Sequence, residues 1–152
     1  MNAELEQSIA AVLDRQIAIA EDLGALLGVE RAAITGPSPD ALARSASDKI
    51  ALLGTLERTD AERQRAFEAA GIDAAPSGDA ASLPAGIARR WRALLRLAAE
   101  CRRANELNGY LIRSRQHQVG QLLDALRGGS AGTYGRNGRA SSTAATRPLA
   151  QV

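Results

Sequence analysis

The stretch IARRWRALLRLAAECRRANELNGYLI (residues 87–112) decides the fold. Its apolar side chains recur at intervals of three and four residues, which gathers them on one face of an α-helix, and most of its arginines fall on the opposite face. The periodicity continues on both sides and predicts a helix over residues 84–127. The predicted stripe comprises Ile87, Trp91, Leu94, Ala98, Cys101, Asn105, Asn108, Ile112, Val119, Leu122 and Leu126.

Two further amphipathic helices are predicted before it, over residues 3–34 and 38–70. In the first, the stripe is Leu5, Ile9, Val12, Ile19, Leu23 and Leu26, flanked by Leu13, Ala20 and Leu27 and interrupted by Gln16. In the second, it is Leu42, Ala46, Ile50, Leu53, Leu56 and Phe67. Ser38 followed by Pro39 is typical of a helix start, and Gly71 is typical of a helix end.

These patterns predict an all-α protein, an elongated antiparallel three-helix bundle with coiled-coil character. At ~1.5 Å per residue the third helix is on the order of 65 Å long, against ~45–50 Å for the other two, so part of it should project beyond its partners. Residues 71–85 form a turn-rich linker. Residues 128–152 contain few apolar side chains, so we expect a helical domain over 1–127 and a disordered tail over 128–152.

Composition argues against other classes. Aromatic residues make up 3% of the 152 residues, too few for a typical β core. The single cysteine excludes an internal disulfide, and no signal peptide or ~18-residue apolar run is present, so we expect a cytoplasmic protein without membrane insertion. Residues 1–30 carry six acids and one base, whereas residues 84–127 carry nine arginines and three acids, so the first and third helices attract each other.

Residues that could support catalysis are scarce. His117 and Cys101 are the only histidine and cysteine, and two such side chains do not make a zinc site. No phosphate loop, nucleophile elbow or dinucleotide motif is present. We therefore expect no enzyme, no metal and no cofactor. The arginines oppose the apolar stripe and lack aromatic partners for base stacking, so we expect no nucleic-acid binding.

Asn105, Asn108 and Gly109 are unusual in a helix interior, and both asparagines lie on the apolar stripe. One interpretation is a polar core layer that fixes the register of the bundle, since buried asparagine is known to do so in packed helices. The other is a recognition surface where the third helix outruns its partners. We place the substrate site along this part of the helix, at Asn105, Asn108, Gly109, Leu111, Ile112, Val119, Leu122, Leu123 and Leu126.

Three segments of the third helix and the tail, NELNGYLI (105–112), VGQLLDALRG (119–128) and TYGRNGR (133–139), resemble the carboxy-terminal signature of the FlgN family of flagellar export chaperones. The upstream stretch LLGVERAAITGPSPDALARSASDKIALLGTLERTDAERQRAF (26–67) is also similar to that family. The resemblance spans nearly all of the predicted helical body and the start of the tail.

The resemblance implies a cytoplasmic, non-enzymatic chaperone of the hook–filament junction (hook-associated) proteins. Such chaperones bind the helical carboxy-terminal ends of their substrates and deliver them to the flagellar type III export gate. It also implies that Tyr134 and Gly135, in the tail, dock on the gate. A homodimer is possible, and the alternative to a chaperone is a self-associating structural or regulatory helical bundle.

Overall fold

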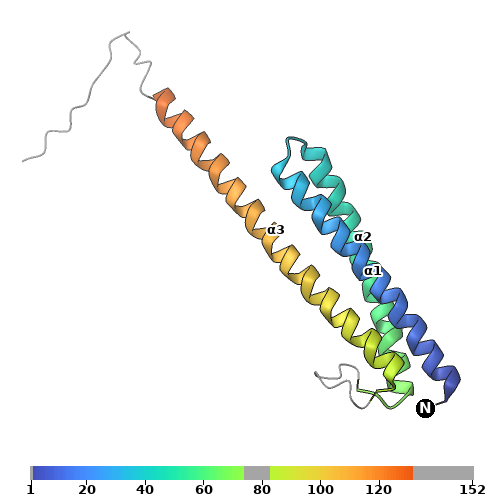
Figure 1. Ribbon diagram of the computed structural model, residues 1–152. Coiled ribbons are helices and arrows are strands. Elements are labelled where there is room, and N and C mark those ends of the chain that lie inside the picture. Colours follow the sequence, from blue (N-terminus) through green and yellow to red (C-terminus); the bar gives the residue numbers. More distant parts are fainter. Residues whose placement is uncertain (1, 74–82, 132–152) are drawn as a thin grey trace, which may run out of the picture. The chain divides into compact units, whose positions relative to one another are not determined.

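The computed structural model describes residues 2–73 and 83–131 and contains three helices over these ranges (Figure 1). They are α1 (Ala3–Thr35, 33 residues), α2 (Pro39–Ala69, 31 residues) and α3 (Ala85–Ala131, 47 residues). The prediction of an all-helical fold with a long third helix is confirmed. Helix α3 continues four residues past the predicted end at Arg127, and the rest of the predicted tail, 132–152, lies outside the described residues.

The helix ends follow from local chemistry. The side chain of Asn2 accepts a hydrogen bond from the backbone N–H of Glu4 at 2.7 Å, and that of Ser38 accepts one from Ala41 at 3.3 Å. Each satisfies an N–H that has no partner within its helix. Gly71 follows α2 with a φ of 67°, a left-handed conformation that costs glycine little.

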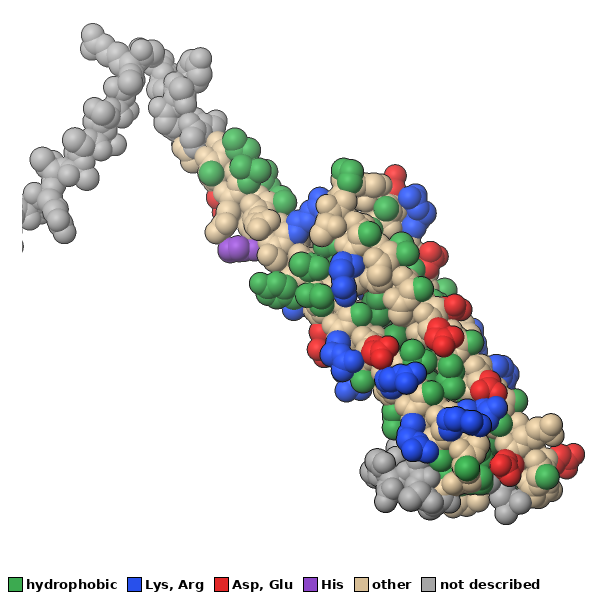
Figure 2. Space-filling view, in the orientation of Figure 1, with side chains coloured by type: hydrophobic (Ala, Val, Ile, Leu, Met, Phe, Trp, Pro, Cys, Tyr) green, Lys and Arg blue, Asp and Glu red, His purple; other side chains and the backbone are tan. Residues whose placement is uncertain are grey.

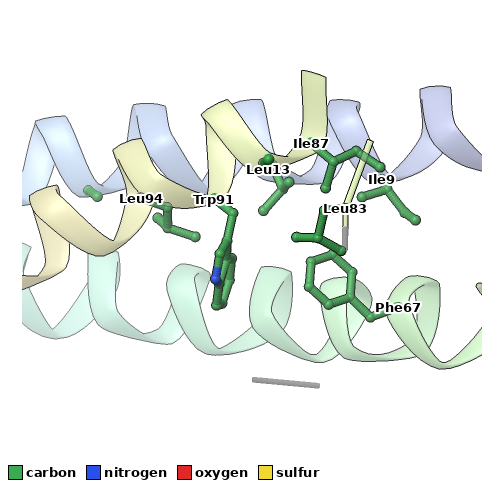
Figure 3. Close-up of a cluster of buried hydrophobic side chains, with 9 residues drawn as sticks. Ile9, Leu13, Phe67, Leu83, Ile87, Trp91 and Leu94 are labelled. Atoms are coloured by element: carbon green, nitrogen blue, oxygen red, sulfur yellow. The ribbon is translucent and has the colours of Figure 1, made fainter. Parts of the chain in front are cut away.

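The chain divides into two units, Met1–Ile112 and Arg113–Val152. In the first unit α1 and α2 lie side by side and are joined by a short loop (Figure 1). The start of α1, the end of α2 and the start of α3 contribute to one core cluster, so α2 runs antiparallel to both of the other helices. Figure 3 shows this cluster and labels seven of its members, Ile9, Leu13, Phe67, Leu83, Ile87, Trp91 and Leu94.

The centre of this core contains a charged group. The guanidinium carbon of Arg63 lies 5.0 Å from the ring centroids of both Phe67 and Trp91, and the two rings are 5.7 Å apart. Arg63 also forms an ion pair with Asp60 at 2.8 Å. Cation–π contact and the carboxylate together compensate for burying the charge.

The register of α1 differs from the predicted stripe. Eight of its ten buried positions follow a regular alternation of four and three residues, as in a coiled coil: Ile9, Leu13, Gln16, Ala20, Leu23, Leu27, Glu30 and Ile34. The other two are Ala33 and Val12, and Ile9, Val12 and Leu23 of the predicted stripe are buried as expected. Leu13 and Leu27, predicted as flanking residues, are therefore at the centre of the interface, whereas Ile19 and Leu26 are only half-buried. Gln16 belongs to the stripe that it was predicted to interrupt.

The predicted stripe of α2 was wrong in its middle. Ile50 and Leu53 are 71% and 40% exposed. Phe67, at the end of the predicted stripe, is buried as expected, and the other buried positions of α2 are Ser45, Thr59 and Arg63. Polar side chains occupy most of the inward-facing positions of α2, so hydrophobicity alone did not identify that face.

Candidate substrate-binding site

Asn108 is buried between α3 and α1, and both the nitrogen and the oxygen of its side-chain amide form hydrogen bonds there. Its Nδ2 donates to the backbone oxygen of Leu27 at 2.9 Å and to Oε2 of Glu30 at 2.8 Å. Its Oδ1 accepts from Nε of Arg31 at 3.1 Å. These bonds form only when Asn108 lies opposite residues 27–31, so the side chain fixes the register of α3 against α1.

Glu30 connects this contact to α2. Its carboxylate is almost fully buried and forms an ion pair with Lys49, whose ammonium group also donates to Asn105 at 3.3 Å. Burial raises the pKa of Glu30, but the hydrogen bonds from Lys49 and Asn108 and the charge of Lys49 outweigh it, so the net pKa is below its ordinary value. Glu30, Lys49 and Asn108 thus form a polar layer that joins the three helices.

The other predicted site residues of the first unit differ in exposure. Asn105 is exposed, whereas Gly109, Leu111 and Ile112 are half-buried. The sequence analysis did not assign Leu107 and Tyr110, which are 43% and 62% exposed on the same turns of α3. Leu107 and Tyr110 are not among the positions spaced three and four apart from which the stripe was predicted, so the periodicity did not identify them.

In the second unit, the predicted apolar residues of α3 are all exposed. Val119 is 50%, Leu122 61%, Leu123 47% and Leu126 63% exposed. They recur at i, i+3, i+4 and i+7, the spacing of a continuous apolar stripe on a helix. Apolar side chains gather along the last described turns of α3 (Figure 2). We call these four residues the apolar stripe of α3.

Several predictions concern other parts of the chain. Tyr134 and Gly135 lie outside the described residues. Among the residues that are described, no group of three or more His, Cys, Asp or Glu side chains could hold a metal ion. None of the described helices combines the length and apolarity needed to cross a membrane. Cys101 is buried, as expected for a small core residue, and its thiol contacts the backbone oxygen of Ala20 at 3.4 Å.

Glu30 and Lys49 are the residues of the polar layer that the sequence analysis did not assign to any site. Glu30 lies seven residues after Leu23 and three after Leu27, so a strict alternation of four and three would have placed it in the interface. A charged residue at such a position is a signal for a buried pair, although its partner cannot be found from the spacing.

Comparison with known proteins gives one match. The family model described as FlgN protein matches residues 1–142 of the chain. No curated protein matches. No solved structure matches.

Proposed function

The chain belongs to the FlgN family, so it is a flagellar export chaperone for hook-associated proteins and not an enzyme, and we propose that its apolar stripe on α3 holds the helical carboxy-terminal ends of those substrates. The observation that carries this proposal is the exposure of Val119, Leu122, Leu123 and Leu126. A helix with apolar residues at matching intervals would cover them, as in other helix-in-groove complexes.

The energetics favour such a contact. Fully burying a Leu or Val side chain contributes about 1.5–3 kcal/mol, so covering four half-exposed ones contributes several kcal/mol before the costs of association. Covered in this way, the substrate ends could not associate with one another. Asn108 would act indirectly, because α1 already engages its donor and acceptor groups. Asn105, Gly109, Leu111 and Ile112 stay predictions as substrate contacts.

A pair of variants tests the stripe. Leu122→Asp should abolish binding of a full-length hook-associated protein in isothermal titration calorimetry, with helicity by circular dichroism nearly unchanged. Ile50→Asp is the matched control, because Ile50 is an exposed aliphatic residue on α2 in the first unit. It should bind like the wild type. Equal loss in both variants, or unimpaired binding by Leu122→Asp, would refute the assignment.

The same experiment separates the alternative function. A self-associating bundle would show a concentration-dependent mass that Leu122→Asp reduces, and no change of mass on adding a hook-associated protein. A chaperone should form a complex with the full-length substrate but not with one truncated at its carboxy terminus.

We also propose that the chaperone works in the cytoplasm and delivers its substrate to the export gate through Tyr134 and Gly135. The support is the similarity of TYGRNGR to the family's tail, together with the large, rigid contact that tyrosine offers. Tyr134→Ala should keep substrate affinity and lose capture by the cytoplasmic domain of the gate in a pull-down assay. Loss of substrate binding instead would contradict the division into two sites.

A further inference from the structure

Arg115 places a positive charge in line with the apolar stripe of α3. It lies four residues before Val119 and seven before Leu122, and these spacings put the three side chains on one face of the helix. All three side chains are exposed. Any helix that covers the stripe and extends one turn towards the start of α3 therefore meets a guanidinium group on an otherwise apolar face.

The other charged residues in the described part of the second unit lie off this face. Arg113 is two residues from Arg115, which corresponds to a rotation of about 200° around the helix. Asp124 is two residues from Leu122 and is turned away from the stripe in the same way. Arg127 lies at the edge of the stripe. Among these described residues, Arg115 is thus the charged one whose position falls within the stripe.

The first unit shows how this chain accommodates a charge on an inward face. Over its described residues, the buried charged side chains are Glu30 and Arg63. Each forms an ion pair with a residue of opposite charge, Glu30 with Lys49 and Arg63 with Asp60. A charge that loses its water without gaining such a partner strongly destabilises the contact that buries it. A helix that covers Arg115 must therefore supply an acid.

We infer that Arg115 determines which helices the stripe accepts, and that it selects a substrate helix with an aspartate or glutamate on its apolar face. This inference rests on the proposed function, in which the stripe holds the carboxy-terminal ends of hook-associated proteins. The guanidinium is a planar fork of N–H donors that can bind both oxygens of one carboxylate. A helix whose contact face is entirely apolar is rejected, because it leaves the guanidinium unpaired.

The spacing of the stripe also locates the acid in the substrate. Helices that pack side by side bring residues of equal spacing opposite one another. The acid should therefore lie four residues from one apolar anchor of the substrate helix and seven from the next, as Arg115 lies from Val119 and Leu122.

Substitutions at Arg115 test this assignment in isothermal titration calorimetry of the full chain with a full-length hook-associated protein. Arg115→Met keeps a long side chain without the charge, and it should weaken binding about tenfold or more because the substrate's acid loses its partner. If no acid faced Arg115, methionine would bind equally well or better, since it adds apolar surface. Arg113→Met, on the opposite face, is the matched control and should change the affinity by less than about threefold.

Charge reversal identifies the acid. Arg115→Glu should bind the substrate more weakly than Arg115→Met, because like charges then meet. Each acid of the substrate's carboxy-terminal helix is changed in turn to arginine, and one of these changes should restore binding to Arg115→Glu but not to Leu122→Asp. The same change should weaken binding to the wild-type chain, which tests the pair without altering the chaperone.

Two results would overturn the inference while leaving the proposed function in place. One is Arg115→Met binding the substrate as tightly as the wild type, or more tightly, when Leu122→Asp has lost binding. The other is that no reversal in the substrate restores binding to Arg115→Glu. If Leu122→Asp itself binds normally, the proposed function fails, and the role of Arg115 fails with it.

Discussion

The two asparagines of α3 should respond very differently to the same substitution. Asn108→Ala removes a hydrogen bond to the Glu30 carboxylate, worth about 1.5–3 kcal/mol, and one to the Leu27 carbonyl, worth about 0.5–1.5 kcal/mol. The more accessible bond from Arg31 adds less. Alanine returns up to ~0.7 kcal/mol through its higher helix propensity. The expected net loss is about 2–3 kcal/mol.

Asn105→Ala is the matched control. Asn105 is exposed and accepts a single hydrogen bond, from Lys49 at 3.3 Å. The gain in helix propensity is the same at both positions and cancels in the difference between the variants. We therefore expect Asn105→Ala to change the free energy of unfolding by less than ~0.5 kcal/mol.

Urea denaturation followed by circular dichroism at 222 nm measures both variants. With a slope of about 2 kcal/mol per M, Asn108→Ala should lower the urea midpoint by about 1 M at an unchanged slope, and Asn105→Ala should leave it in place. Midpoints that agree within ~0.25 M would mean that the Asn108 contacts contribute no net stability, and the argument for a register-fixing polar layer would fail.

The remaining predictions concern the core and the buried carboxylate. Leu94→Ala should lower the free energy of unfolding by about 2–5 kcal/mol because Leu94 is buried. Leu95→Ala, at the exposed neighbouring position, should cost under ~1 kcal/mol. If both variants have the melting temperature of the wild type, both residues lie on the surface. The pKa of Glu30 is below its ordinary value of 4.5, so its charge stabilises the fold above that pH, and this contribution is lost as pH falls through the folded-state pKa. Glu30→Gln should therefore show a weaker loss of stability between about pH 6 and pH 3 than the wild type, and parallel pH profiles would contradict this.

Periodicity predicted the number, order and approximate bounds of the helices because local signals determine them. Ser38 with Pro39 begins α2, and Gly71 follows its end, as the sequence predicted. The apolar positions near the start of α3 were also correct, since Ile87, Trp91 and Leu94 are all buried. Each of these features depends on residues within one or two helical turns.

The buried polar positions could not be predicted in the same way. Glu30 is buried because Lys49 and Asn108 meet it, and these residues lie 19 and 78 positions away in the sequence. Gln16 likewise depends on Asp60, 44 positions away. Whether a polar side chain can be buried depends on its partner, and a helical wheel for one segment does not contain that partner. This is also why Ile50 was assigned to the wrong face.

The uneven distribution of apolar contacts along the first unit has a consequence for how it opens. The large core cluster joins the start of α1, the end of α2 and the start of α3, whereas Leu23, Leu27 and Cys101 form only a small cluster near the polar layer. Backbone amides around Leu13, Phe67 and Trp91 should thus exchange with deuterium most slowly, and those around Glu30 and Asn108 much faster. The bundle is then firmly held at one end and opens from the other, so α3 can separate near Asn108 while its first turns stay attached.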